Sequence, residues 1–484
     1  MTCQLPFDCL NDIFKCLEED KHTLYSCLLV NHLWCEVSVR IIWGNIWNIR
    51  TPRNNIVSSS ILSTLVACLP NESKELLCKN EIFILTPTPK LPLFNYTAFC
   101  KILPISSIDE LVVNSLQNKK PSKKRLVKEE IIKMFANQVY PLKKLFYYNN
   151  YYPLNFSFPY FPGLRDLSEL YCSTILPSNF YYQLSQICCN LHTLSIIFDG
   201  YATPNELKEL ISLQNNLKVL ILSAYDNASW KDIIPALKNN SNTITKLRLY
   251  GNKSNLPFSF VGLFYNLQEF IFSFMNVVNG NYFEGFKSLQ YVNFSNLQTL
   301  KFPYHCPRPE YVMEFLETNG KNLKKFYVRG SNKALRLSIA DFCPNLRSLF
   351  IVFNNNEIDI LKVIFNNCEY LESIKVWCGK HYLSEKKVFE TVANYSPNNF
   401  YELKIDNISH SDISPEDLEP FFISWKNRIT KRILSLIIIK EYCKNLDDDE
   451  ENMEIIKKYE NLGIIRFRTI GYEKEKDEEN YFII

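Results

Sequence analysis

The sequence predicts an α/β fold in which a short N-terminal module of three helices precedes a curved solenoid of repeats, with parallel strands on its concave face and helices outside. Three observations predict it: a short apolar phrase recurs after residue 140, amphipathic helical segments lie between its copies, and the first residues form apolar helical stretches. A chain of 484 residues is too long for one ordinary compact core. A stack of repeats can hold such a chain as one elongated body.

The recurring phrase has the form L-x-x-L-x-L, and its last two apolar positions alternate as they do in a strand. Clear copies are LHTLSI from Leu191, LKVLIL from Leu217, ITKLRL from Ile244, LQEFIF from Leu267, LQYVNF from Leu289, LQTLKF from Leu297, LKKFYV from Leu323, LRSLFI from Leu346 and LESIKV from Leu371. Fainter copies are LKKLFY from Leu142, LSELYC from Leu167, FYELKI from Phe400, ILSLII from Ile433 and LGIIRF from Leu462. The copies at 289 and 297 lie too close together for two repeats, so one is expected to be out of register.

Amphipathic helical patterns lie between these expected strands, at residues 205–214, 309–320, 357–368 and 385–395. One strand with one helix cannot bury its inner face, whereas a stack of such units forms a continuous core. Most copies begin roughly 22 to 33 residues apart, and the pattern resembles leucine-rich repeats of the longer kind. The polar residue that many such repeats place after the strand is present only in part, at Asn252 and Asn354.

The first residues read L-P-x-x-x-L-x-x-I-F-x-x-L, followed by the acidic break EEDK, a second apolar helix, V-x-x-x-W and a further Trp. Proline is tolerated at a helix start, and the apolar residues share one helical face. This stretch resembles an F-box, with Asp8 in the acidic position and Asn31 where the family often has cysteine. The matching residues are Leu5, Pro6, Leu10, Ile13, Phe14, Leu17, Leu24, Cys27, Leu28, Val30, Trp34 and Trp43.

The resemblance implies that this module docks a Skp-type adaptor and, through it, a cullin–RING ubiquitin ligase. The adaptor-binding residues that it implies are Leu5, Pro6, Leu10, Ile13, Phe14, Leu17, Leu28, Val30 and Trp34. Three short helices rarely stabilise themselves alone, so part of their apolar surface is expected to meet another polypeptide. The alternative is that they cap the N-terminal end of the solenoid. We expect residues 1–47 to form the F-box-like module, 48–135 a linker or cap region, and 136–484 the solenoid.

The concave face of the solenoid is the expected substrate-binding surface. Side chains between the apolar positions of each strand should point onto that face. The expected binding residues are Lys246, Arg248, Tyr250, Lys325, Tyr327, Arg329, Phe350, Lys375 and Trp377. Aromatic residues and arginine are enriched in binding hot spots, and Lys and Arg suit an acidic or phosphorylated protein segment. In the alternative reading, Phe350, Val352 and Trp377 pack against an insertion or a C-terminal tail.

Composition and motifs restrict the other function classes. A formal net charge of +3 gives no reason to expect a nucleic acid or membrane partner. The sequence has 16 cysteines but no C-x-x-C pair, and six scattered histidines, so we expect no metal and no cofactor. The acidic N-terminus lacks a basic leader, and no apolar run is long enough for a bilayer, so we expect a reducing cytoplasm or nucleus.

Catalytic motifs for phosphate loops, zinc proteases and serine hydrolases are missing from the sequence. We therefore expect a non-catalytic receptor subunit, with ubiquitin transfer carried out by associated ligase components. Cys–His catalysis stays open, because the partners of such a site need not be adjacent in sequence.

Two charge runs and one apolar segment complete the reading. Residues 56–69 are expected to be helical, whereas 118–130 and 446–452 are expected to be charged loops. The basic run at 118–130 also resembles a weak nuclear localisation patch. Two other function classes stay open: a repeat scaffold with a degenerate F-box, and a small-molecule sensor with a closed concavity and a buried arginine.

Overall fold

The structure is a computed structural model of the chain. It describes residues 5–48, 55–86, 92–139, 141–148, 161–199, 202–225, 228–252, 256–274, 284–330, 332–430, 432–440 and 445–472. The chain divides into two compact units, which are described separately. Unit 1 comprises Met1–Val219 with Asp232–Asn240, and unit 2 comprises Leu220–Lys231 with Ser241–Ile484.

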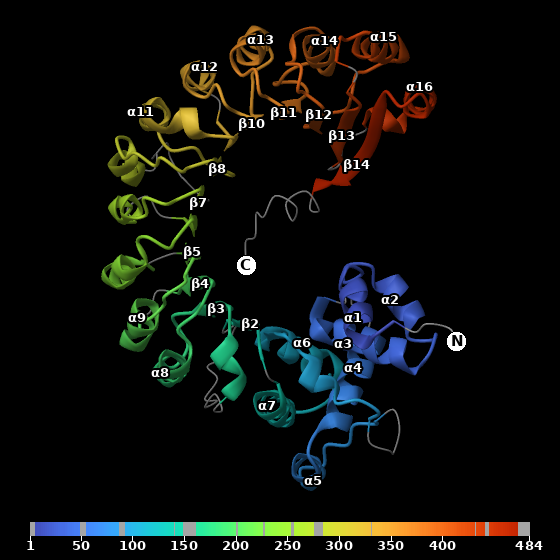
Figure 1. The fold of residues 1–484 in the computed structure, drawn as a ribbon, viewed down its shortest axis with the longest axis vertical. Helices are drawn as coiled ribbons and strands as arrows, with labels where there is room; N and C mark the ends of the chain where they lie inside the picture. The colour runs from blue at the N-terminus through green and yellow to red at the C-terminus, as the bar shows by residue number, and fades with distance from the viewer. Residues whose placement is uncertain are drawn as a thin grey trace. The chain divides into compact units, whose positions relative to one another are not determined.

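Unit 1 begins with helices and continues with strand–helix repeats (Figure 1). Its helices are α1 Phe7–Lys15, α2 Lys21–Cys27, α3 His32–Gly44, α4 Asn55–Cys68, α5 Asn71–Lys79, α6 Ile105–Ser115, α7 Pro121–Gln138, α8 Ser178–Ile187, α9 Asn205–Ser212 and α10 Ile234–Leu237. Its strands are β1 Ile102–Pro104, β2 Lys144–Tyr147, β3 Glu169–Ser173 and β4 Thr193–Phe198. Short 3-10 helices are η1 Ile46–Asn48, η2 Tyr96–Phe99, η3 Pro162–Asp166 and η5 Lys238–Asn240.

Unit 2 continues the same alternation of strands and helices. Its strands are β5 Val219–Ala224, β6 Lys246–Gly251, β7 Glu269–Phe274, β8 Thr299–Phe302, β9 Lys325–Val328, β10 Ser348–Ile351, β11 Ser373–Cys378, β12 Glu402–Asn407, β13 Leu434–Lys440 and β14 Ile465–Gly471. Its helices are α11 Pro309–Asn319, α12 Lys333–Phe342, α13 Ile358–Asn367, α14 Glu385–Tyr395, α15 Pro415–Lys426 and α16 Glu450–Asn461. The 3-10 helices η6 Ser259–Leu263, η8 Glu284–Leu289, η9 Gly320–Asn322 and η10 Leu446–Asp448 replace or extend helices between the strands. The last two residues of η4 Lys231–Ile233 belong to unit 1.

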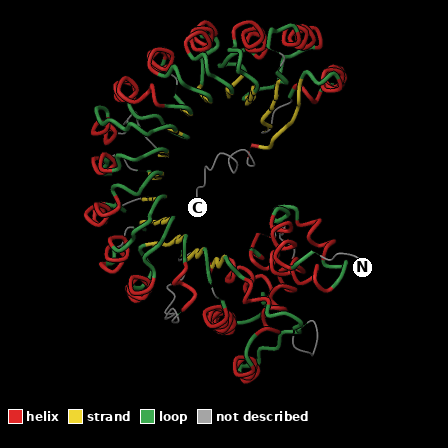
Figure 2. Tube along the Cα trace, in the orientation of Figure 1, coloured by secondary structure: helices red, strands yellow, loops and turns green. Residues whose placement is uncertain are grey.

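The strands pair in chain order within each unit, from β1 to β4 in unit 1 and from β6 to β14 in unit 2, and these pairings are parallel. From β2 to β12, each strand begins two residues into a copy of the phrase, so equivalent positions of successive repeats face each other, as Leu349 faces Phe326 and Ile374. Within unit 2 the strands line one side and the helices the other (Figure 2). The predicted α/β fold with leucine-rich repeats is therefore confirmed.

The four predicted helices correspond to α9, α11, α13 and α14. Of the two crowded copies, the one at 297 forms β8, whereas Leu289 ends the short helix η8, so the copy at 289 was out of register. Strand β1 lies in the segment 48–135 and pairs with β2, although no copy of the phrase marked it. It has only three residues, which is too short for a repeat pattern to reveal.

Phenylalanine fills much of the core of unit 2, which accounts for its abundance in the sequence. The Phe272 ring lies 4.5 Å from Phe274 and 5.9 Å from Phe302, measured between ring centroids. Phe286 and Phe315 continue the row, 5.5 Å apart. These rings are fully or almost fully buried, so each repeat packs on the next through aromatic contacts.

Polar side chains tie the turns of neighbouring repeats together. Buried Asn319 accepts a hydrogen bond from the Phe294 backbone N–H at 2.7 Å and donates to the Val292 carbonyl at 2.9 Å. The thiol of Cys368 donates to the Cys343 carbonyl at 3.4 Å, so buried cysteines serve the same turns. This polar residue was predicted after the strand, but it stands before the phrase, at the end of the helix.

Asparagines directly before the phrase form a second, exposed row. Asn345 donates to the Lys321 carbonyl at 2.8 Å, and Asn266 donates to the Asn242 carbonyl at 2.9 Å. Each contact joins one repeat to the turn of the repeat before it. The recurring N-L dipeptide was the signal that the sequence analysis missed.

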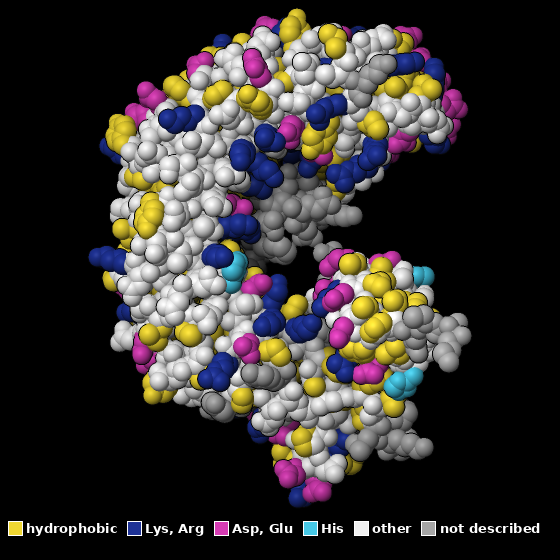
Figure 3. Space-filling model, viewed as in Figure 1, with side chains coloured by type: hydrophobic (Ala, Val, Ile, Leu, Met, Phe, Trp, Pro, Cys, Tyr) yellow, Lys and Arg dark blue, Asp and Glu magenta, His cyan; other side chains and the backbone are white. Residues whose placement is uncertain are grey.

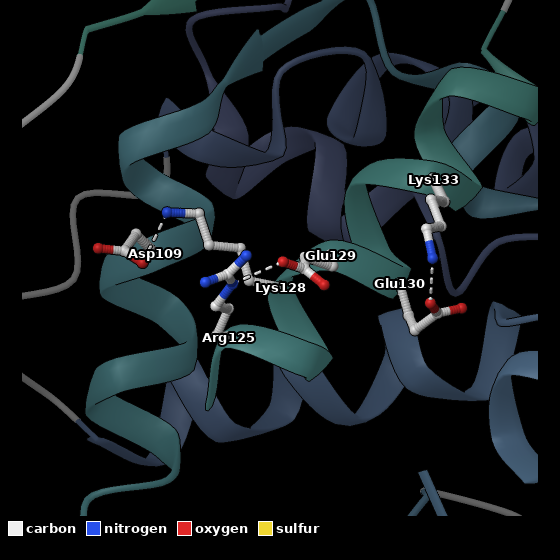
Figure 4. A network of polar contacts seen from close by, with 6 residues as sticks. All are labelled: Asp109, Arg125, Lys128, Glu129, Glu130 and Lys133. Carbon is white, nitrogen blue, oxygen red and sulfur yellow. Dashed lines mark hydrogen bonds and ion pairs between the residues drawn. The ribbon is translucent and has the colours of Figure 1, made fainter. Parts of the chain in front are cut away.

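The basic run at 118–130 does not form the predicted loop. From Pro121 it is the first part of helix α7, and Lys128 is buried with its ammonium group 2.8 Å from Asp109 (Figure 4). Arg125 pairs with Glu129 and Lys133 with Glu130, each at 2.7 Å on the same helix. Proline at the first helical position and pairs at three- and four-residue spacing favour this helix.

The acidic run at 446–452 was also predicted to be a loop, and this prediction was wrong as well. Its residues form η10 and the start of α16, where the Asp449 side chain caps the helix by accepting a hydrogen bond from the Asn452 N–H at 3.1 Å. Acidic residues favour a helix N-terminus, where backbone N–H groups lack partners.

Two further observations concern the described ranges. Their helices include none that is both long and apolar enough to cross a bilayer. The cysteines that the structure describes are free thiols, several of them buried, including Cys188 and Cys343.

We predict that replacing Asn319 with leucine destabilises the repeats, because it leaves the Phe294 N–H and the Val292 carbonyl buried without partners. The expected loss is about 2 to 4 kcal/mol, measured as a shift in the urea unfolding midpoint. Asn296→Ala is the matched control, since its exposed amide makes only a 3.4 Å contact with Asn266. Equal midpoints for Asn319→Leu and the control would contradict this role.

Candidate interaction surfaces

The N-terminal module, defined as α1 to α3, has a small core of its own. Its buried residues are Leu10, Phe14, Leu24, Cys27, Val37, Ile42 and Ile46. The Phe14 ring meets Trp34 edge to face, with ring centroids 5.1 Å apart. These contacts join α1 to α3 and fix the orientation of the remaining side chains.

Side-chain caps define the starts of α2 and α3. The Asp20 carboxylate accepts from the Thr23 N–H at 3.1 Å and from its hydroxyl at 2.6 Å, and these hydrogen bonds lower the pKa of Asp20. Asn31 accepts from the Trp34 N–H at 2.9 Å. Asn31 therefore has a structural role at the position where cysteine is often found in F-boxes, because asparagine is a strong N-cap residue.

Apolar side chains remain exposed along this part of the chain, from just before α1 to just after α2. They are Leu5, Ile13, Tyr25, Leu29 and Val30, together called the apolar patch, and Leu29 is 89% exposed. Hydrophobic side chains gather over these helices in the space-filling view (Figure 3). An exposed apolar cluster on a small helical module is typical of a protein interaction site.

The structure divides the nine predicted adaptor-binding residues by exposure. Leu10 and Phe14 are 3% exposed and belong to the core of the module, so their direct contact with an adaptor stays a prediction. Leu17, Leu28 and Trp34 are half-buried. Leu5, Pro6, Ile13 and Val30 are exposed. Leu29 and Tyr25 are exposed but were not predicted, although the adjacent apolar pair Leu29–Val30 after α2 is a sequence signal for them.

The second candidate surface is the inner face of unit 2, defined as the strand side chains of β6 to β14 that point away from the helices. At its β6 end, Arg248 forms an ion pair with Glu269 on β7, with Nη2 2.9 Å from Oε1. Tyr250 is 6% exposed, and burial raises its pKa to about 12. Lys246 is exposed. Of these three predicted residues, only Lys246 is free to meet a ligand as expected.

Three of the predicted residues of β9 to β11, Tyr327, Phe350 and Trp377, lie in one largely aromatic cluster. Val352 and Tyr382 complete this cluster. The rings of Tyr327 and Phe350 are 4.0 Å apart, and those of Trp377 and Tyr382 are 5.2 Å apart, measured between centroids. Tyr382 comes from the loop between β11 and α14, so this connecting loop packs against the cluster. A tail beyond residue 472 lies outside the described residues.

Two cations lie against these rings. The Lys375 ammonium group is 4.9 Å from the Phe350 centroid and 3.7 Å from an Asp406 carboxylate oxygen. The Arg329 guanidinium is 4.4 Å from the Trp377 ring centroid. Burial, and then the positive charge of Arg329, lower the pKa of His305.

The predicted binding residues in and beside β9 to β11 differ in how exposed they are. Tyr327, Phe350 and Lys375 are buried, because neighbouring rings and Asp406 cover them. Their part in substrate binding stays a prediction. Arg329 and Trp377 are half-buried, and Lys325 is exposed. The buried Trp377 indole N–H has no hydrogen-bond partner among the described residues.

The described residues offer no group of three or more His, Cys, Asp or Glu side chains that could hold a metal ion. The fully buried arginine, Arg336, pairs with Glu357 at 2.6 Å and donates to the Val352 carbonyl at 2.8 Å. These contacts give Arg336 a structural role, so it does not support the small-molecule sensor.

Comparisons with known proteins add little to this description. No family model matches the chain, and no curated protein matches it. Among solved structures, the chain is similar to the leucine-rich repeat-containing protein LegL7 from Legionella pneumophila, with 10% sequence identity and a TM-score of 0.34. The similarity covers 61% of this chain and 91% of that one. The fold assignment therefore rests on the strand register and the repeated turn contacts described above.

Proposed function

We propose that the chain is a substrate-recognition subunit of a cullin–RING ubiquitin ligase. In this proposal the N-terminal module docks a Skp-type adaptor, and the repeats bind the protein to be ubiquitinated. The chain itself carries no catalytic residue for this task, because the associated ligase components transfer ubiquitin. It needs no cofactor and acts in the cytoplasm or the nucleus.

The observation that carries this proposal is the exposed patch of Leu5, Ile13, Tyr25, Leu29 and Val30. Three of these residues belong to the set that the F-box resemblance implies, and they lie on a module whose own core contains other members of that set. Burial of apolar side chains under a partner stabilises the complex by roughly 25 cal/mol per Å² of buried apolar surface. A helical adaptor surface is a suitable partner for such a patch.

A repeat array suits the second task. Its parallel register presents side chains of successive strands in rows, and such extended surfaces are used for binding in repeat proteins. Aromatic residues and arginine, which dominate binding hot spots, occur together in the cluster around Trp377 and Arg329. An interaction scaffold with a degenerate F-box would use the same face without adaptor docking.

We predict that Leu29→Glu combined with Val30→Glu abolishes docking of a purified Skp-type adaptor. Both side chains are more than half exposed, so the charges should not disturb the core, whereas they would be buried without partners in the complex. The expected loss of affinity is at least about 30-fold, as for a binding hot spot. Isothermal titration calorimetry measures it.

Leu462→Glu is the matched control, since Leu462 is 54% exposed but lies beyond the module, at the end of α16. Phe14→Ala is unsuitable, because this buried side chain supports the fold of the module. If wild-type protein fails to bind the adaptor, or the double variant binds as tightly as wild type, adaptor docking through this patch is rejected.

We further predict that Arg329→Glu with Trp377→Ala separates the two activities. Both residues belong to the inner face of unit 2, so substrate capture should fall while adaptor affinity stays unchanged. Proximity labelling during proteasome inhibition, compared between wild type and variant, measures capture. An unchanged set of labelled proteins would show that this face does not select substrates.

A further inference from the structure

We propose that the inner face of unit 2 binds an extended acidic protein segment through two separate cationic sites, with an apolar residue of that segment seated between them. This inference rests on the proposed function, in which the repeats bind a protein. It adds the chemical class of the bound segment and the spacing of its acidic residues.

The charge on this face is strongly asymmetric, although the whole chain has a formal net charge of only +3. Acidic residues at the described inner positions are Glu269, Glu402 and Asp406. Basic residues at such positions are Lys246, Arg248, Lys301, Lys325, Arg329, Lys375, Lys404, Arg466 and Arg468. Lys and Arg side chains gather along this side of unit 2 in the space-filling view (Figure 3).

Ion pairs involve each of the three acidic residues. Glu269 pairs with Arg248, Asp406 with Lys375 at 3.7 Å, and Glu402 with Lys404 at 4.0 Å. None of the acidic side chains that the structure describes forms an ion pair with Lys325 or Arg329 on the β9 side, or with Arg466 or Arg468 on β14. Lys325 and Arg329 form the first cationic site, and Arg466 and Arg468 form the second.

At the first site, two donors, the Arg329 guanidinium and the indole N–H of neighbouring Trp377, have no acceptor among the residues that the structure describes. The Arg329 guanidinium is held 4.4 Å from the Trp377 ring centroid, an arrangement that orients its planar group without neutralising its charge. The indole N–H of Trp377 is buried, with no partner among the described residues, and such an unpaired donor is costly. A carboxylate accepts hydrogen bonds from both kinds of donor, whereas an apolar ligand would leave them unpaired.

The second site lies on the last described strand. Arg466 and Arg468 are exposed and share one face of β14, opposite Ser435 and Ile437 of β13. Alternate residues of a strand are about 6.6 Å apart. The carboxylate of Glu460, from α16, accepts a hydrogen bond from the Phe467 backbone N–H at 2.8 Å. Because Arg466 and Arg468 are exposed on one face, they offer two adjacent positive charges to a run of acidic residues.

The separation of the two sites sets the spacing in the ligand. Five strand-to-strand steps lead from β9 to β14, and neighbouring strands are about 4.8 Å apart, which gives roughly 24 Å. An extended chain covers this distance in about seven residues. Half-buried Trp377 and Tyr382, near the first site, offer apolar surface to a side chain between the acidic clusters.

Fluorescence anisotropy with the full chain tests this inference. The probe is a labelled synthetic peptide with two blocks of three glutamates, separated by seven residues with a central phenylalanine. Matched peptides replace glutamate with glutamine, or shorten the separation to three residues. We expect the first peptide to bind at least tenfold more tightly than either of the others, and its affinity to fall as salt is raised.

Charge-reversal variants assign the binding to the two sites. Arg329→Glu alone, and Arg466→Glu with Arg468→Glu, should each weaken binding of the first peptide at least tenfold. Lys333→Glu and Lys457→Glu are the matched controls, because both lysines are exposed on helices, α12 and α16. These control variants should bind the peptide as wild type does.

Residues 473–484, EKEKDEENYFII, have the same acidic and apolar composition as the expected ligand, so a chain ending at Tyr472 is measured in parallel. Peptide binding by either form, with the stated dependence on Arg329 and on spacing, supports the proposal. Absence of binding by both forms overturns it. Equal affinity for the three-residue spacer, or for an RNA dodecamer, would also overturn it, because the face would then be a general polyanion surface.

Adaptor titration keeps this outcome distinct from that of the proposed function. Adaptor binding without peptide binding rejects the acidic-segment inference and leaves the ligase proposal in place. Peptide binding without adaptor binding rejects the ligase proposal and supports the inference that the inner face binds acidic segments.

Discussion

The parallel register between successive repeats is the constraint on which the rest of the structure depends. Each strand places its apolar positions beside those of the previous repeat, as Leu349 does with Phe326. Buried turn residues such as Asn319 and Cys368 satisfy backbone groups of the neighbouring repeat. A shift by one residue would place apolar side chains on the inner face and break these hydrogen bonds together. The same register places the inner-face residues in rows, so the fold and the candidate binding surface have one physical cause.

The sequence predicted the repeats well because their signal is periodic and is repeated many times. The two apolar positions of each strand and the helix between strands are local patterns, and the structure confirms both. Strand β1 was missed because three residues cannot display a period. The charge runs were misjudged for another reason: Lys128 is buried beside Asp109, and Asp449 caps α16, contacts that composition alone does not reveal.

The sequence indicates which residues belong to the candidate surfaces, but it does not indicate how exposed each of them is. Strand alternation placed Arg329 and Trp377 on the same face, whereas it could not show that their side chains are in contact or that Asp406 pairs with Lys375. In the N-terminal module, Leu10 and Ile13 both match the resemblance, but Leu10 is 3% exposed and Ile13 is 50% exposed. Exposure depends on how α1 packs against α3, which is a tertiary property. The structure thus divides a set of matching residues into those that hold the module together and those that are free to meet a partner.

The central claim is that a small helical module exposes an apolar patch that another polypeptide covers. Hydrogen–deuterium exchange of the full chain, with and without a purified Skp-type adaptor, tests it most directly. We expect slower exchange in α1 and in residues 28–30 when the adaptor is present, with the strands of unit 2 unchanged. Exchange that is unaltered in α1 and in residues 28–30 at saturating adaptor would contradict it.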